Sequence, residues 1–240
     1  MKKLTALSML ALALSANVYA QAQDSYTVAY DKQAPVLDGH LNESVWDKLQ
    51  AIRFIDPWQQ GEIPDTQFKA YHDDQYLYFA FDVEDPNTVI FEKVHDEMMI
   101  ARQDRVELFF AQAPIDKAKA DGSYPNYFAL EMDYQGRTLS IKADSQKNRD
   151  VSWDMQTLET KGNLTDKGYV LEGRIALKEL RELNLIHDNK IQTGVYRAEF
   201  SIINGKEVAQ WITWVDPKTE KPNFHINSSF GTFVLAPSGK

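Results

Sequence analysis

The polar segment that leads into residues 100–110 carries the side chains best placed to bind a ligand. Three apolar residues of this stretch alternate with Arg105, Glu107 and Phe109, which is the spacing of a strand with one strongly apolar face. The preceding loop, from His95 to Gln103, would hold its side chains at an edge of the sheet. Binding sites are common on loops that a rigid scaffold supports. We therefore expect a site where this loop meets the strand.

The familiar catalytic motifs do not occur in the sequence. It contains no Gly-x-Ser-x-Gly turn, no glycine-rich phosphate loop and no His-Glu-x-x-His pair, which disfavours hydrolases of those classes, nucleotide enzymes and zinc proteases. A glycosidase needs two opposed carboxylates. A chain with 35 acidic residues neither shows nor excludes such a pair. We predict a protein that is not an enzyme.

Acidic, histidine and methionine side chains leave two cofactors open. Oxygen ligands for a structural calcium ion are offered by His95-Asp96, by Asp73-Asp74, and by Asp82 with Asp85, although none of these has EF-hand spacing. Haem without a covalent link needs only axial ligands. The available ones are His95, Met98, Met99, Met132, Met155 and His225, of which Met132 fits core packing better.

The first twenty residues predict a signal peptide. Lys2 and Lys3 precede an apolar run from Leu4 to Ala16, and small residues end at Ala20. The run is shorter than the roughly 20 residues that span a bilayer, so we expect cleavage and not a retained anchor. Residues 21–240 then form a single periplasmic or secreted domain with no membrane span. The absence of cysteine excludes disulfides and a lipoprotein anchor.

The charge of the mature chain narrows its partners. Removing residues 1–20 takes away Lys2 and Lys3 and no acidic residue, so the net charge changes from −9 to −11. Nucleic acids and anionic membranes both favour basic surfaces, and neither is expected as a partner. Hydrophobic residues make up 43% of the chain, which is enough to bury a sizeable core.

Short strands dominate the expected secondary structure. Alternating or β-rich segments between turn residues predict about ten strands, at residues 26–30, 68–72, 76–84, 106–110, 127–133, 138–143, 155–160, 169–175, 196–202, 208–215 and 232–235. Asn42 predicts the N-cap of a helix that buries Trp46, and leucines stripe a second helix over 177–185. We predict an all-β fold: an antiparallel β-sandwich, jelly-roll-like, with two short accessory helices.

Polar residues recur on the second face of several predicted strands. They are Glu107, Glu131, Glu172, Arg174, Arg197 and Glu199. Two interpretations stay open. The residues form cross-strand ion pairs on a solvated face, each contributing roughly 0.2–1 kcal/mol, or they form the polar floor of a concave binding face.

The succession of motifs resembles the carbohydrate-binding modules of family 9, and the wider set of extracytoplasmic sandwich domains that bind sugars or haem. The resemblance spans nearly all of the predicted mature chain. Its motifs are residues 37–43 followed by Trp46, residues 74–81 with Asp85, residues 104–109, 127–136 and 168–172, and residues 224–225 before Phe230-Gly231.

The resemblance implies a site. In its sugar-binding members two Trp rings sandwich a terminal sugar, and polar side chains bind the hydroxyl groups. The two ring positions correspond here to Ala101 and Phe224, a basic position corresponds to Ala129, and a polar contact corresponds to Glu107. Because Ala101 lacks a ring, we expect Trp58 or Trp153 to provide the platform. The predicted ligand-binding residues are Glu107, Phe224, Trp58, Arg102, Trp153 and His225.

The predicted function is therefore non-catalytic binding of a saccharide, or of a similar small polar ligand, on the concave face or at one end of the sandwich. A role in polysaccharide degradation would need a separate glycoside hydrolase as partner. Two alternatives remain. One is a haem-binding electron-transfer module of the same fold, and the other is an accessory interaction domain without a small-molecule ligand.

Overall fold

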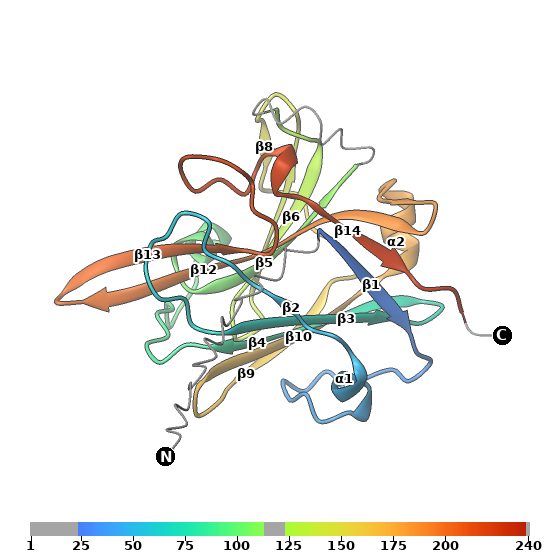
Figure 1. Cartoon of the computed structure of the whole chain (residues 1–240), viewed down its shortest axis with the longest axis horizontal. Helices are drawn as coiled ribbons and strands as arrows, with labels where there is room; N and C mark the ends of the chain where they lie inside the picture. Colours follow the sequence, from blue (N-terminus) through green and yellow to red (C-terminus); the bar gives the residue numbers. More distant parts are fainter. Residues whose placement is uncertain (1–23, 113–122, 239–240) are drawn as a thin grey trace, which may run out of the picture.

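Two β-sheets face each other across one apolar core in the computed structural model, which describes residues 24–112 and 123–238 (Figure 1). The predicted signal peptide lies outside these residues. The strands are β1 (Ser25–Tyr30), β2 (Ile52–Arg53), β3 (Thr66–His72), β4 (Tyr76–Glu84), β5 (Arg105–Ala111), β6 (Tyr127–Met132), β7 (Thr138–Ala143), β8 (Arg149–Asp150), β9 (Glu159–Leu164), β10 (Gly168–Ala176), β11 (Ile186–His187), β12 (Lys190–Ile203), β13 (Lys206–Thr213) and β14 (Gly231–Leu235). Helical segments are α1 (Ser44–Lys48) and α2 (Leu177–Glu182), with 3-10 turns η1 (Glu97–Arg102) and η2 (Asn227–Ser229).

Strand β1 joins the two sheets. Sheet A has the order β8-β7-β6-β5-β12-β14-β1, and sheet B continues as β1-β3-β4-β10-β9. Residues 25–28 of β1 pair with β14 and residues 29–30 pair with β3, and both pairings are parallel. The prediction of a purely antiparallel sandwich was therefore wrong, because the direction in which β1 pairs depends on partners that lie far along the chain.

The inner faces of both sheets meet in the main core. Alternation on β4 and β5 predicts this correctly, since Phe79 and Phe81 from sheet B and Leu108 and Phe110 from sheet A are fully buried there. Strands β6 and β14 add further apolar side chains, including Leu130. The leucines of α2 close one end, and Leu180 is fully buried.

A helix covers the outer face of sheet B. Trp46 of α1 packs edge-on against Tyr71 of β3, with ring centroids 5.1 Å apart, and is buried as predicted. The predicted N-cap was wrong: α1 begins at Ser44 after Glu43, which makes no side-chain cap. The Glu43 carboxylate instead accepts hydrogen bonds from Val36 N and from Trp46 Nε1.

Strands β9 and β12 begin at other residues than expected, β12 at Lys190 and not near Tyr196. The ninth strand begins at Glu159 and not near Met155, because Met155 enters the core and starts a turn that closes with Leu158 N donating to its carbonyl. Strands β12 and β13 form a long hairpin that projects from the body (Figure 1). Its tip is Asn204-Gly205, both with positive φ, as a two-residue hairpin turn requires.

No helix among the described residues is both long and apolar enough to cross a membrane.

Candidate functional site

Loop segments bring a second apolar cluster onto the outer face of sheet A. Phe109 of β5, Tyr127 of β6 and Tyr196 of β12 point outward, and Phe224 and Phe230 from the loop before β14 pack over them. We call these five rings the aromatic layer. Phe224 lies nearly parallel to Tyr196, with ring centroids 4.3 Å apart, and the Trp58 ring is tilted against Phe224 with centroids 6.1 Å apart.

A buried ion group lies on the same face of sheet A. Glu107 of β5 stands directly opposite Glu131 of β6, and Arg105 lies between them. Arg105 Nε is 2.9 Å from Glu107 Oε1 and 2.6 Å from Glu131 Oε2. All three side chains are buried. Arg105 and Glu131 form a cross-strand ion pair, and Arg105 also pairs with Glu107 on its own strand. The group is buried, so it does not lie on the solvated face that one interpretation of the sequence expected.

The electrostatics of this group follow from burial. Loss of hydration raises the pKa of Glu107 to about 8, and the negative charge of Glu131 adds to the rise, whereas Arg105 opposes it. Because Arg105 fills the space between the two carboxylates, they are not placed on opposite sides of a bond as a glycosidase pair would be.

A histidine connects the aromatic layer with the edge of the sheet. His225 Nδ1 lies 2.7 Å from the Tyr127 hydroxyl. Burial, with a smaller effect from the positive charges of Arg149 and Arg105, lowers the pKa of His225 to about 3. His225 is therefore neutral at physiological pH and can share a hydrogen bond with Tyr127 in either direction.

An open cleft of about 410 Å³ lies at Tyr127, the hydrogen-bond partner of His225, where the ends of β6, β7 and β8 meet. Tyr127 and Phe128, which are 2% and 3% exposed, line it together with polar residues, among them Asn126, Lys142 and Arg149. Amide, ammonium and guanidinium groups suit a small ligand that carries hydroxyl groups.

A tight turn preforms the rim of this cleft. The Asp144 carboxylate accepts hydrogen bonds from Gln146 N at 2.9 Å, from Asn148 N at 3.0 Å and from Asn148 Nδ2 at 2.8 Å. These bonds hold residues 144–148 in one conformation, and Arg149 follows directly. Its side chain is therefore carried by a fixed backbone, which limits the entropy lost when a ligand binds.

The structure places four of the six predicted ligand-binding residues together. Glu107, Phe224, Trp58 and His225 all lie on the outer face of sheet A. Positions Ala101 and Ala129 pack against the same cluster. The matched positions therefore share one face, but Glu107 and Phe224 are 1% and 4% exposed, so both are buried.

The other two predicted residues lie elsewhere. Arg102 is exposed at the end of η1. Trp153 packs on Phe128, with ring centroids 4.6 Å apart, on the inner side of β6 and away from Glu107. The sequence analysis did not single out Tyr127, Arg149 or Asn126, because an expected strand end and an isolated polar loop give no signal of a shared cleft.

The expected haem ligands are spread over the molecule. Met132 and Met155 are buried in the main core, and His225 contacts Tyr127. His95 and Met98 are exposed, Met98 by 41%.

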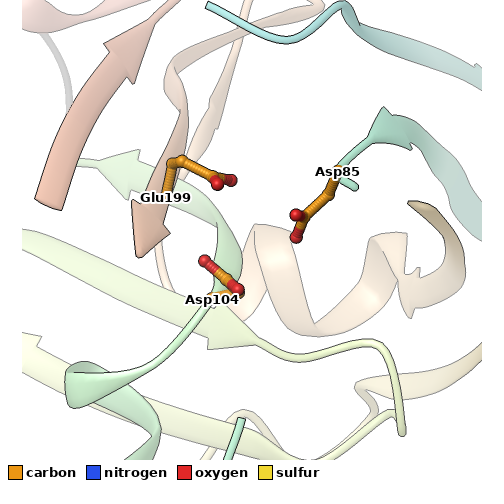
Figure 2. Close-up of side chains that lie close together, drawn as sticks. All are labelled: Asp85, Asp104 and Glu199. Carbon is orange, nitrogen blue, oxygen red and sulfur yellow. The ribbon is translucent and has the colours of Figure 1, made fainter. Parts of the chain in front are cut away.

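The expected calcium ligands lie in separate parts of the structure. Asp73 accepts hydrogen bonds from Gln75 N and Tyr76 N in the β3–β4 turn, and Asp96 accepts one from Met98 N at the start of η1. Asp85 lies near Asp104 and Glu199 (Figure 2), and not with Asp82.

The sequence analysis placed Glu199 and Arg197 on the second strand face with Glu107. The structure turns both toward sheet B, where Arg197 Nη1 donates to Thr66 Oγ1 and to the Glu84 carbonyl.

Comparison with known proteins agrees with this fold. A model of the family described as "Carbohydrate family 9 binding domain-like" matches residues 37–238. Exoglucanase XynX of Acetivibrio thermocellus is 27% identical over 208 residues, which are 85% of this chain and 17% of the exoglucanase. The chain therefore spans only a small part of that relative.

Solved structures extend the comparison. A family 9 carbohydrate-binding module from Caldicellulosiruptor kristjanssonii, solved with cellotriose, has a TM-score of 0.62 at 20% identity and covers 90% of this chain and 95% of that one. A second module from the same organism, solved with glucose, has a TM-score of 0.56 at 21% identity; the match covers 90% of this chain and 97% of that one. A structure described as a putative carbohydrate-binding protein from Bacteroides uniformis has a TM-score of 0.68 at 15% identity, and the match covers 88% of this chain and 99% of that one. At these identities the likeness shows a shared fold.

Proposed function

This protein belongs to the carbohydrate family 9 binding domain-like family, and from that membership we propose that it binds a saccharide without modifying it, in the cleft at the ends of β6, β7 and β8. The observation that carries the proposal is the composition of this cleft. It combines exposed amide and cationic residues with a turn that its own hydrogen bonds hold in place. Pockets of this kind, within the usual range of roughly 300–1,000 Å³, hold small ligands.

The burial of two predicted ligand-binding residues is the reason why the proposed site is the open cleft. Glu107 and Phe224 are 1% and 4% exposed, so a sugar reaches neither without a change in the packing around them. The cleft is open and lies next to His225 and Tyr127. The proposal therefore gives Arg149 and Asn126 the hydrogen bonds to the sugar, and gives Glu107 the role of fixing β5 beneath the site.

The relatives suggest which ligands to test first. The solved modules of C. kristjanssonii are complexes with cellotriose and glucose, and the curated relative is an exoglucanase. We take glucose and short β-glucans as the first candidates. The leader pattern supports a periplasmic or secreted location, and a separate glycoside hydrolase is the enzyme partner that an accessory binding protein would serve.

Isothermal titration of the mature chain with glucose, cellobiose and cellotriose tests the proposal. Arg149→Ala removes a charged donor, worth about 1.5–3 kcal/mol, and should weaken binding roughly tenfold or more. Arg53→Ala, an exposed arginine of sheet B, is the matched control and should bind as the wild type does. No heat with any of the sugars contradicts saccharide binding by this family member.

Arg102→Ala separates the two positions for the site. Loss of binding in Arg102→Ala, with Arg149→Ala unchanged, would move the site from the cleft to the end of η1.

A further inference from the structure

The polar groups of the cleft at the ends of β6, β7 and β8 differ in how far the protein itself uses them. Most of the acceptor oxygens already have donors, whereas the guanidinium of Arg149 has no partner among the described residues. A ligand has to match the groups that remain free, because a polar group that loses water and gains no partner weakens binding. The free groups therefore indicate the class of ligand.

Donors of the turn after β7 occupy the first acid of the cleft. Asp144 Oδ1 accepts hydrogen bonds from Gln146 N and Asn148 N, and its Oδ2 accepts one from Asn148 Nδ2. These bonds hold the pKa of Asp144 below its ordinary value, so the carboxylate stays charged. Asn126 Oδ1, across the cleft, accepts a hydrogen bond from Ser145 N at 3.0 Å. These oxygens are therefore already bound within the protein.

The second acid of the cleft is compensated by its neighbours. Asp150 Oδ1 accepts hydrogen bonds from Ser152 N at 3.0 Å and from Ser152 Oγ at 2.7 Å. Asp150 also lies opposite Lys142 across the β7–β8 pair. The Ser152 bonds and, to a smaller extent, the charge of Lys142 lower the pKa of Asp150. The charges of Lys142 and Asp150 therefore offset each other.

Arg149 is the cation of the cleft that has no counter-charge. It is exposed and, within residues 24–112 and 123–238, forms neither an ion pair nor a hydrogen bond. Other arginines of the chain are held by carboxylates, namely Arg53, Arg105, Arg137, Arg174 and Arg197. A guanidinium cannot lose its proton in a protein and offers five N–H donors. Arg149 is therefore available to an acidic group of a ligand.

A second cation lies on the same turn. Lys147 Nζ is 4.2 Å from the centre of the Tyr124 ring, which is a cation–π distance. Residues 142–149 contain three basic residues and one acidic residue, in a chain whose net charge is −9. The rim of the cleft is thus locally basic on an acidic protein, and such a contrast draws anions to one place.

We propose that the cleft selects an acidic saccharide, a sugar that carries a carboxylate or a sulfate group, and that Arg149 binds this group. This rests on the proposed function, since it keeps the same cleft and names the class of sugar. A guanidinium binds such groups through two parallel hydrogen bonds, and an ionised acid needs no donor from the ligand side in return. The exposed amide of Asn126 lies in the same lining and can donate to a neighbouring hydroxyl.

A neutral sugar is the competing ligand. Each of its hydroxyl groups both donates and accepts, whereas the oxygens of Asp144 are already engaged. Its bonds to Arg149 have only one charged partner and lack the fork-to-fork geometry of an acid. The charges of Asp144 and Asp150 repel an anion in turn, so we expect a preference of about tenfold and not a larger one.

Isothermal titration of the mature chain at pH 7 with glucose, glucuronic acid and glucuronamide tests the proposal. The three sugars differ only at the last carbon, which carries a hydroxyl, a carboxylate or a neutral amide. Glucuronic acid should bind about tenfold more tightly than the other two, and added salt should reduce the difference. Glucose 6-sulfate in a parallel titration shows which of the two acidic groups fits better.

The outcomes separate the class of sugar from the function itself. Equal affinity for glucose, glucuronic acid and glucose 6-sulfate would overturn the preference for acids and leave saccharide binding intact. No heat with any of these sugars would contradict the proposed function.

Substitutions assign the acidic group to one residue. Arg149→Gln removes the charge and keeps a polar side chain, so the ratio of the affinities for glucuronic acid and glucose should fall to about one. Arg149→Lys keeps the charge without the fork and should retain part of the ratio. Arg53→Gln, at an exposed arginine of sheet B, is the control and should leave the ratio unchanged. A full ratio in Arg149→Gln would contradict the assignment.

Discussion

Glu107 and Glu131 oppose each other across the β5–β6 pair, both buried, with the single guanidinium of Arg105 between them. Like charges directly across a strand pair destabilise a sheet, and Arg105 offsets only part of that repulsion. Glu107 therefore binds a proton more readily in the folded chain than in the unfolded chain. This gives the fold a measurable dependence on pH.

Glu107 should make the fold less stable as the pH rises. Its pKa is about 8 in the folded chain, above the ordinary value of 4.5, so the folded state holds a proton that the unfolded state has released between these values. The free energy of unfolding should fall as the pH rises from about 4.5 to about 8. Urea unfolding at pH 5 and pH 8 measures it, and Glu107→Gln should reduce the difference. An unchanged difference in Glu107→Gln would show that other groups cause it.

His225 should act in the opposite direction at acid pH. Its pKa in the folded chain is about 3, below the ordinary 6.5, so the unfolded state takes up a proton as the pH falls below 6.5. The free energy of unfolding should decrease from pH 6.5 toward pH 3. His225→Gln, which keeps a polar group near Tyr127, should flatten this slope in urea titrations. His95→Gln, an exposed histidine, should leave the slope as it is.

Phe224 should be the structural centre of the cover on sheet A. It stacks on Tyr196 and contacts Trp58 and Trp211, and it is buried. Phe224→Ala leaves a cavity and should lower the free energy of unfolding by about 3–5 kcal/mol. Val36→Ala, at a residue that is 66% exposed, should change it by less than about 0.5 kcal/mol. Denaturant titration compares the two, and a loss below about 1 kcal/mol for Phe224→Ala would mean that the layer is loosely packed.

The sequence predicts faces well where a strand pairs with its neighbours along the chain. The alternation in β4 and β5 places Phe79, Phe81 and Leu108 in the core because burial of one face sets the period. The resemblance likewise places Glu107 and Phe224 on one face. The burial of both residues depends on loop conformations, which the alternation of strands does not encode.

Contacts between distant strands account for the rest. Arg197 and Glu199 have the spacing of a solvated face, but on β12 both side chains point toward sheet B. There Arg197 donates a hydrogen bond to Thr66 and forms an ion pair with Asp85. Asp85 finds Asp104 and Glu199 only once both sheets are assembled. The cleft has the same origin, since Tyr127 and Arg149 come together through the pairing of β6, β7 and β8.

The most direct measurement of the central claim is an NMR titration of the ¹⁵N-labelled mature chain with cellotriose. Saccharide binding in the cleft predicts shifts of backbone signals that are largest at Asn126, Tyr127 and Arg149 and that saturate with sugar concentration. A spectrum unchanged at millimolar sugar, or shifts centred on Trp58 and η1 with the cleft unaffected, would contradict it.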